Sequence, residues 1–153
     1  MSFWTWALEA YARPGVPEAC LDLQDNYAQS VPLLLWAAWA AREGRDLSFG
    51  DLMDGSSLAA RWEGAAVAPL RAARRGLKPS QDGIDDDLRE ALRAEVKALE
   101  LRAEQVLMDK LEAMAPPAAG KPLALDDALL AAAEAWAFAA PKAPLKKLAK
   151  TLS

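Results

Sequence analysis

A chain of 153 residues, with 53 % hydrophobic and 26 % charged residues, can build one domain with its own core and is too apolar to be intrinsically disordered. Its net charge of −4 lacks the basic character that phosphate recognition needs, so no nucleic-acid partner is expected. The absence of histidine excludes Ser-His-Asp and Cys-His catalysis within the chain, and no motif predicts a metal or a cofactor.

The single cysteine, Cys20, cannot form an internal disulfide, which suits a reducing compartment. Residues 1–11 have no basic start and no long apolar run, so they do not resemble a targeting segment. The longest apolar stretch, residues 31–41, is about half of the roughly 20 residues that a membrane-spanning helix needs. We therefore expect a cytoplasmic protein without stable membrane insertion.

Alanine, leucine, glutamate and arginine dominate the chain and β-branched residues are scarce, which favours helix over strand. The predicted fold class is all-α, a single helical bundle of about five to six helices. Apolar residues at helical spacing place these helices at residues 3–12, 17–29, 33–42, 57–77, 84–114 and 125–139, with a short helical turn and loop over 47–55.

The helix predicted at residues 33–42 is apolar nearly all round, which is typical of the centre of a bundle. Leu35 and Trp36 are therefore expected to be almost fully buried. Five tryptophans are assigned to the core, with a tryptophan-lined ligand pocket as the alternative: Trp4, Trp6, Trp36, Trp39 and Trp62.

A short polar linker at residues 78–83 predicts that the helices on either side of it form a long antiparallel hairpin, kinked at Pro69. This hairpin places Arg61 opposite Glu100. The buried face of its first helix is expected to contain Leu58, Trp62, Ala65, Pro69, Ala73 and Leu77. The buried stripe of its second helix is expected to contain Leu88, Leu92, Val96, Leu99, Ala103, Val106 and Met114.

One face of the first hairpin helix carries four cations, Arg71, Arg74, Arg75 and Lys78. Like charges at this spacing repel one another. The simpler interpretation is that they belong to a helix C-terminus and face an acidic cluster, residues 85–87, across the short turn. The alternative is an anionic ligand or an acidic partner surface, which arginine binds with bidentate geometry.

The acidic cluster Asp82, Asp85, Asp86 and Asp87 precedes the long helix. Its spacing fits neither an EF-hand loop nor the Asp-Asp-x-x-Asp pattern of helical prenyl-transfer enzymes, so capping of the helix N-terminus is preferred to a magnesium or calcium site.

A charged stripe runs along the long helix through Arg89, Arg93, Lys97, Glu100 and Glu104. A solvated face laced by weak surface ion pairs is the simpler interpretation. The alternative is a polar pocket formed by three of these residues together with two arginines of the neighbouring helix: Lys97, Glu100, Glu104, Arg71 and Arg74.

Polar residues are also dense at residues 21–26, directly before the most apolar helix. Gln24 and Asp25 are expected to be buried and to hydrogen-bond the backbone interrupted near Pro32. The alternative is that both face a ligand.

Several short strings together resemble one family. In the first third they are Phe3-Trp4, Trp6-Ala7, Tyr11, Pro14-Gly15-Val16, Ala19-Cys20-Leu21, Leu23-Gln24-Asp25, Val31-Pro32-Leu33-Leu34-Leu35-Trp36 and Trp39. In the middle they are Trp62, Pro69-Leu70-Arg71, Arg74, Lys78, Lys97, Glu100-Leu101 and Ala103-Glu104-Gln105. This set resembles the bacterial domain-of-unknown-function family numbered 2390 over roughly residues 2–112. The resemblance implies a small helical bacterial protein without an assigned activity. Ala28, Ser30 and Pro32 stand where that family pattern has Gly, Asp and Asn.

The predicted organisation is a helical domain over residues 1–140 and a basic tail over 141–153, uncoupled by Pro141 and Pro144. The tail carries a short leucine stripe and four lysines: Leu145, Leu148, Leu152, Lys142, Lys146, Lys147 and Lys150. Three leucines are too few for stable membrane insertion. The tail is expected to be mobile or loosely docked, with at most weak, salt-sensitive binding to acidic surfaces.

Because no catalytic, metal or phosphate-binding motif is present, the first functional hypothesis is a non-enzymatic protein-interaction module whose partner is another protein. The alternative is a small-molecule-binding or enzymatic domain, and the two differ in whether the polar candidates converge on one concave pocket. The candidate ligand-binding residues are Gln24, Asp25, Arg71, Arg74, Lys78, Lys97, Glu100 and Glu104.

Overall fold

The computed structural model describes all of residues 1–153 and contains helices without any strand. The elements are α1 (Phe3–Tyr11), α2 (Val16–Tyr27), α3 (Val31–Arg42), α4 (Phe49–Trp62), the π-helical segment η1 (Glu63–Val67), α5 (Ala68–Gly76), α6 (Asp86–Met114), α7 (Leu125–Trp136) and α8 (Lys142–Leu152). The all-α prediction is confirmed, with more helices than the five to six expected. No helix has both the length and the apolarity that crossing a bilayer requires.

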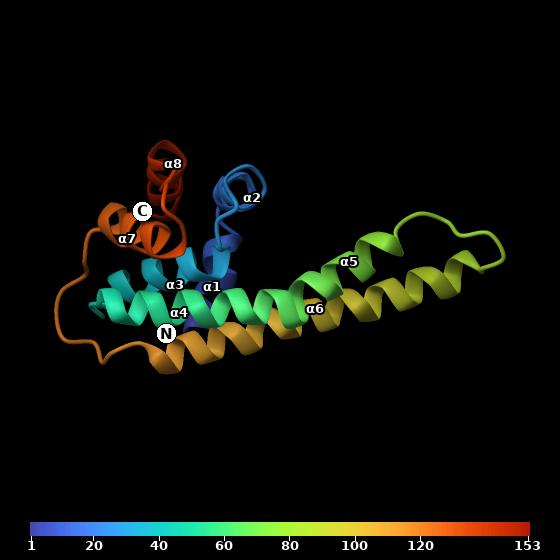
Figure 1. Ribbon diagram of the computed structural model, residues 1–153, viewed down its shortest axis with the longest axis horizontal. Helices are drawn as coiled ribbons and strands as arrows, with labels where there is room; N and C mark the ends of the chain where they lie inside the picture. The colour runs from blue at the N-terminus through green and yellow to red at the C-terminus, as the bar shows by residue number, and fades with distance from the viewer.

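The molecule has two regions, which we call the body and the arm (Figure 1). The body contains α1–α4, α7, α8 and the C-terminal half of α6. The arm is the hairpin of α5 and the N-terminal half of α6, and it projects away from the other helices. The predicted antiparallel hairpin is therefore present, and its far half packs only against itself.

Helix α3 lies at the centre of the body, as its sequence predicted. Nine of its twelve residues are buried, and both Leu35 and Trp36 are almost completely inaccessible to solvent. Helix α4 crosses it at Gly55, where an added Cβ would lie 2.5 Å from the Trp36 ring. A residue without a side chain is thus needed on α4 for the Trp36 ring to fit.

The tryptophans are only partly core residues. Trp6, Trp36 and Trp39 are buried, which confirms the prediction for these three. Trp4 and Trp62 are half-buried at the edge of the core. The Trp62 indole donates a hydrogen bond of 2.8 Å to the Ala103 carbonyl and so joins α4 to α6.

The prediction of a short turn over residues 47–55 and a helix from Ser57 is wrong, because α4 already begins at Phe49. Ser48 and Asp51 form a reciprocal capping box at this start. From there α4, η1 and α5 form one continuous rod. The π-helical turn ends two residues before Pro69, which cannot donate to the helix ladder, and α5 departs from the line of α4 as predicted for this proline (Figure 1).

The predicted buried stripe of the long helix is wrong over most of its length. Four of its seven members are exposed to solvent, Leu88, Leu92, Leu99 and Val106, and only Ala103 is buried as predicted. The other buried residues of α6 lie outside the predicted stripe and are Arg89, Glu100, Leu107, Met108 and Leu111. The physical reason is that Arg89 donates to the Leu77 and Lys78 carbonyls, and Glu100 pairs with two arginines of α5, so the polar face of α6 turns toward α5.

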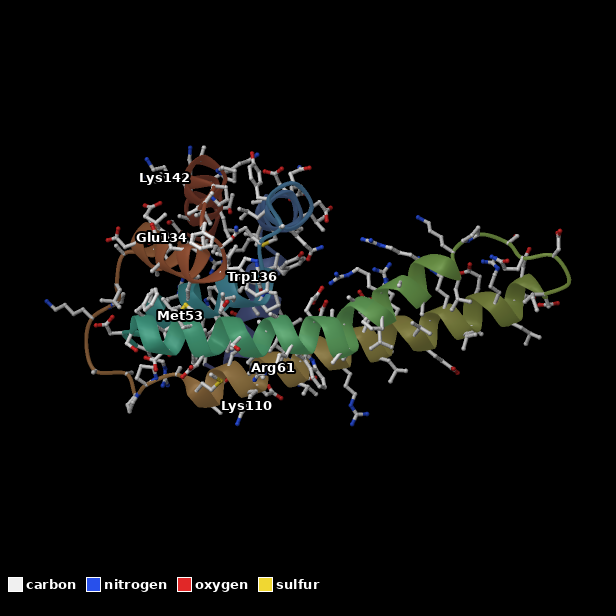
Figure 2. All side chains as sticks on the ribbon, viewed as in Figure 1. Met53, Arg61, Lys110, Glu134, Trp136 and Lys142 are labelled. Atoms are coloured by element: carbon white, nitrogen blue, oxygen red, sulfur yellow. The ribbon has the colours of Figure 1, made fainter.

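The prediction of a mobile or loosely docked tail is also wrong. Residues 142–152 form α8, which packs against α2 and α7 with Leu145, Leu148 and Leu152 all buried. The Arg13 guanidinium donates a 2.7 Å hydrogen bond to the Leu152 carbonyl at its end. The lysines remain on its exposed side, as Lys142 illustrates (Figure 2). The leucine stripe is too short for a membrane but long enough to dock on two helices.

Candidate ligand-binding pocket

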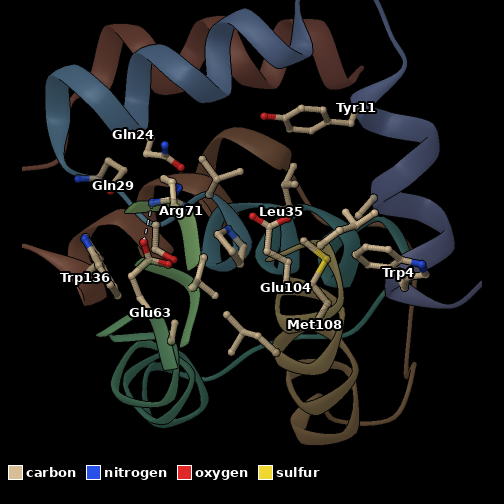
Figure 3. Close-up of a pocket in the computed structure, with 18 of the residues that line it drawn as sticks. Trp4, Tyr11, Gln24, Gln29, Leu35, Glu63, Arg71, Glu104, Met108 and Trp136 are labelled. Atoms are coloured by element: carbon tan, nitrogen blue, oxygen red, sulfur yellow. Dashed lines mark hydrogen bonds and ion pairs between the residues drawn. The ribbon is translucent and has the colours of Figure 1, made fainter. Parts of the chain in front are cut away.

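A cavity of about 620 Å³ lies where the arm leaves the body (Figure 3). Helices α1, α2, α3 and α6, the α4–α5 rod and the end of α7 all contribute to its wall. Most of the residues that line it are hydrophobic, including Trp4, Leu35, Leu107 and Met108. Its volume falls within the roughly 300–1,000 Å³ typical of small-molecule sites.

The structure brings half of the predicted site residues to this cavity. Gln24, Asp25, Arg71 and Glu104 line it directly. Arg74 and Glu100 stand just behind the wall and are joined to it through ion pairs. Lys78 and Lys97 are exposed and lie outside it.

Other polar residues of the wall were not among the predicted site residues: Tyr11, Gln29, Ser30, Glu63 and Arg75. Glu63 was missed because it precedes Arg71 by eight residues, a spacing that an α-helix does not place side by side. The π-helical turn between them changes the register and allows their ion pair. Arg75 belongs to the predicted cation cluster, so its spacing was a usable signal.

Two arginines and two glutamates form a network along one side of the cavity. Arg71 lies 2.9 Å from Glu63 and 3.5 Å from Glu100, and Glu100 also accepts a hydrogen bond from Arg74. Because the two positive charges face two negative ones, this network is neutral as a whole. Arg71 and Arg74 are therefore already compensated without a ligand.

Two predictions about these charges are wrong. Arg61 does not face Glu100; its guanidinium donates to the Ser57 hydroxyl one turn earlier on its own helix. The acidic cluster before α6 does not neutralise the four cations either. Asp85 caps α6 by accepting from two backbone N–H groups, which confirms the capping prediction, while Asp86 contacts Ser80 and Arg89.

Glu104 is the one carboxylate deep in the cavity that has no hydrogen-bond or ion-pair partner. Burial, and to a smaller degree the neighbouring Glu100 carboxylate, raise its pKa. A carboxylate in a largely apolar site without a partner is costly to keep ionised. Glu104 therefore favours any ligand that brings a positive charge or a hydrogen-bond donor.

Gln29 contains a second unpaired acceptor, buried behind the same wall. Its side chain is only 4 % exposed, and its amide nitrogen donates to the Tyr27 carbonyl at 3.4 Å. The amide oxygen Oε1 is buried without any donor. Buried polar atoms in folded proteins are almost always paired, so this atom marks a place where a donor is missing.

Aromatic side chains enclose the polar groups. Trp4, Tyr11 and Trp136 come from opposite sides of the cavity (Figure 3). Burial raises the pKa of Tyr11 to about 12, so its hydroxyl stays neutral. The Trp136 indole N–H is already used, since it donates to the Ala28 carbonyl at 2.7 Å. These rings add aromatic surface to the wall rather than further charge.

The predicted structural role of Gln24 and Asp25 is wrong. Gln24 is half-buried and Asp25 is exposed, and their only side-chain hydrogen bond is a long one to each other, at 3.4 Å. Neither bonds the backbone before Pro32, because Ser30 caps α3 there. Both side chains are thus free for the alternative, in which they face a ligand.

The structure contains no group of three or more histidine, cysteine, aspartate or glutamate residues placed to hold a metal ion. Cys20 lies in the core, where burial raises the pKa of its thiol to about 12. It is therefore a protonated and inaccessible thiol at neutral pH, not an activated nucleophile. The cavity offers binding groups, with no nucleophile beside a base.

Comparison with known proteins yields one match. Residues 2–111 match the model of a family described as "Protein of unknown function (DUF2390)". Among curated proteins and solved structures nothing matches this chain. The matched residues include the wall of the cavity except for Trp136 on α7.

Proposed function

We propose a function for this chain from the premise that it belongs to the DUF2390 family of proteins of unknown function. It binds a small organic amine that also has an apolar group, in the cavity between body and arm. The observation that carries this proposal is the unpaired Glu104 carboxylate inside a mostly apolar wall. An ammonium group beside Glu104 would compensate a charge that the protein leaves alone.

The charge balance of the wall supports an amine rather than an acid. The Arg71 and Arg74 charges are neutralised by Glu63 and Glu100. Among the charged side chains that line the interior, Glu104 is the one left unpaired, and it accepts hydrogen bonds; the unpaired Gln29 amide oxygen is buried behind the cavity surface. The remaining free arginine, Arg75, is exposed at the rim, where solvent screens it.

The aromatic and aliphatic residues of the wall would contact the apolar group of the ligand. Trp4, Tyr11 and Trp136 can receive a cation over a ring face, an interaction worth roughly 0.5–2 kcal/mol. Leu35 and Met108 provide apolar surface beside them. The combination of aromatic faces with one carboxylate is the chemistry by which proteins recognise amines.

The test is a thermal-shift and calorimetric comparison of three matched probes, 2-phenylethylamine, 2-phenylethanol and 3-phenylpropanoate. We expect the amine to raise Tm and to bind more tightly than the alcohol, and the carboxylate to have no effect. Glu104→Gln should remove the preference for the amine. Glu134→Gln, which changes an exposed glutamate on the outer side of α7 (Figure 2), is the matched control and should bind normally.

Two results would contradict the proposal. A larger shift with the carboxylate would assign the cavity to an anion held by the arginines, which is the other half of the sequence hypothesis. Equal shifts with the amine in the parent protein and in Glu104→Gln would show that Glu104 takes no part in binding.

The protein-interaction module, which was the first hypothesis from the sequence, remains a prediction about other surfaces of the molecule. We also propose a cytoplasmic location, which the lone buried thiol of Cys20 supports, because such a thiol suits a reducing compartment. Expression of a tagged protein in its host, followed by fractionation, tests this.

A further inference from the structure

The solvent-facing side of α6 is the largest feature that the cavity leaves unexplained. Leu88, Leu92, Leu99 and Val106 lie along it and are between 48 % and 71 % exposed. In Figure 1 α6 runs along the lower edge of the molecule, with the other helices above it. Contiguous exposed apolar side chains of this kind mark an interaction surface in soluble proteins.

The spacing of the stripe is that of a helix that packs along another helix. Leu92, Leu99 and Val106 repeat every seven residues, and Leu88 stands one turn before Leu92. A seven-residue repeat keeps one seam of a helix facing a helical partner. The occupant that fits this seam best is therefore itself an α-helix with an apolar stripe.

We propose that the occupant is a second copy of this chain, with the two α6 helices antiparallel and crossing at Leu99. A twofold axis at Leu99 sets Leu92 of each copy against Val106 of the other. Because such an interface is self-complementary, each contact occurs twice. The proposal concerns a face on the opposite side of α6 from the cavity and does not depend on the ligand proposed above.

Two unpaired charges favour the antiparallel arrangement. Glu95 and Arg102 lie on the same flank of the stripe, four residues before and three residues after Leu99. Their neighbours three and four residues away are all alanine, leucine, glutamine or valine, so neither has an opposite charge within its own helix. Neither takes part in an ion pair of the monomer.

The twofold axis at Leu99 brings Glu95 of each copy beside Arg102 of the other, on the same flank, and so forms two ion pairs. A parallel pairing in register would instead place this flank of the two copies on opposite sides of the seam, where Glu95 and Arg102 cannot pair across the interface. Complementary charges that meet across an interface favour the arrangement that brings them together. The charge pattern thus selects the antiparallel dimer over the parallel one.

The apolar part of the seam is short, about 21 Å from Leu92 to Val106 at 1.5 Å per residue, because Leu88 lies beyond Val106 of the other copy. It is smaller than the interfaces of obligate dimers, so the dimer is expected to be reversible. The measurement is sedimentation equilibrium of the full chain from about 1 µM to about 500 µM, a range that covers micromolar dissociation constants. We expect a concentration-dependent monomer–dimer equilibrium.

Leu99→Glu places two like charges at the axis and should leave the protein monomeric throughout this range. Leu21→Glu, which changes an equally exposed leucine on α2, is the matched control and should dimerise normally. Glu95→Arg and Arg102→Glu should each weaken the dimer by about tenfold or more, and the double variant should restore it. Circular dichroism confirms the fold of each variant.

A parent protein that stays monomeric at every concentration overturns the proposal. A dimer that survives Leu99→Glu places the interface elsewhere. A double charge reversal that does not restore the dimer overturns the antiparallel register. Amine binding by the Leu99→Glu variant reports on the cavity separately, so failure of one proposal is distinguishable from failure of the other.

Discussion

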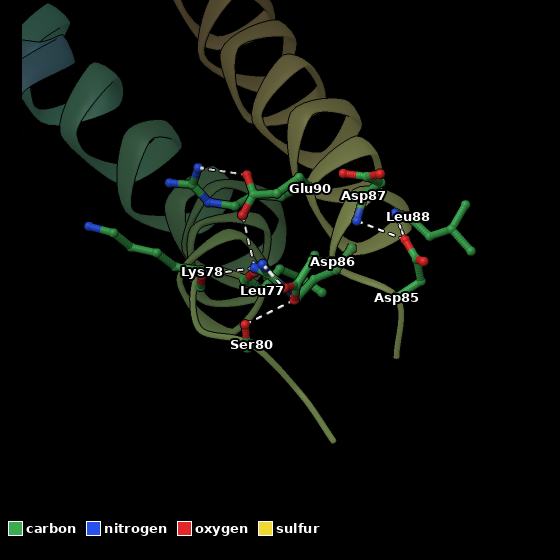
Figure 4. Close-up of polar contacts among 10 residues, drawn as sticks. Leu77, Lys78, Ser80, Asp85, Asp86, Asp87, Leu88 and Glu90 are labelled. Atoms are coloured by element: carbon green, nitrogen blue, oxygen red, sulfur yellow. Dashed lines mark hydrogen bonds and ion pairs between the residues drawn. The ribbon is translucent and has the colours of Figure 1, made fainter. Parts of the chain in front are cut away.

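The body and the arm are built from similar amino acids but are held together by different interactions. The body has a core of 29 buried residues, and none of these lies between Ala59 and Leu107. Helix α5 of the arm buries no residue completely. At the far end of the arm the Arg89 guanidinium donates to the carbonyls of Leu77 and Lys78 and closes the last turn of α5 (Figure 4).

This difference shows how a polypeptide can extend a helical hairpin beyond its core. Apolar burial stabilises the body without directional requirements and is not screened by salt. The arm depends on arginine pairs and carbonyl contacts, which are individually weaker and are screened where they are exposed. The leucines that would have stabilised the arm stay on its surface. We expect the arm to open locally before the body unfolds.

The largest expected effect concerns the centre of the body. Trp36→Ala removes a fully buried ring between α3 and Gly55 and should lower the free energy of unfolding by about 3–5 kcal/mol. Urea denaturation followed by circular dichroism measures it. A loss of less than about 1 kcal/mol would mean that the body does not depend on this side chain.

A smaller, local effect is expected in the arm. Arg89→Ala leaves the Leu77 and Lys78 carbonyls, directly after α5, and two carboxylates without their donor and should destabilise the arm by about 1–3 kcal/mol. Hydrogen exchange should accelerate in α5 and the first half of α6, while α3 stays protected. Lys97→Ala, an exposed cation on the same helix, is the control. Uniform acceleration over the whole chain would contradict the separation of body and arm.

A gain of about 1 kcal/mol in the free energy of unfolding is expected from a substitution at Ala28, beside the cavity. Ala28 ends α2 with a φ of 51°, the left-handed region that costs a side chain roughly 1–2 kcal/mol and glycine very little. Ala28→Gly should therefore raise Tm, although the unfolded chain gains some entropy. The same change at Ala12, which has ordinary helical dihedrals, should lower it.

The smallest effect is a pH-dependent gain from Glu104→Gln. Because the pKa of Glu104 is raised in the folded protein, the folded state holds its proton more tightly than the unfolded state does. Glu104 therefore costs stability as pH rises from its ordinary value of 4.5 through the raised value, and the cost persists at neutral pH. The variant should have a higher Tm than the parent at pH 7, and the difference should vanish below pH 4.5. A lower Tm at pH 7 would contradict the unpaired state of this carboxylate.

Much of the local structure was predictable from the residues alone. The uniformly apolar Leu33–Ala41 segment could only be a central helix, and Ser2 and Asp85 cap the helices that follow them. The hairpin was predictable from its short linker. Of the cavity wall, Gln24, Asp25, Arg71 and Glu104 were found as unusual polar residues near helix starts or on charged stripes.

The rest depended on contacts between distant residues. Glu63 meets Arg71 only because a π-helical turn lies between them. Trp136 reaches the cavity from the end of α7, the third helix after that turn in the chain. The buried side of α6 was predicted from its leucines, and that prediction was wrong. An apolar period shows that a helix has a face to cover, but it does not show which neighbour is available to cover it.

The sequence by itself determined the helical class, the central helix α3 and the caps, because these depend on residues within a few turns of one another. Only the tertiary structure decided that Arg89 and Glu100 turn inward while Leu88 and Leu99 face water, that α8 docks, and that Glu104 lies unpaired in a cavity whose wall also contains three aromatic residues. Those outcomes depend on which helices meet, and the free energy of each burial is defined only once the partner surface is in place.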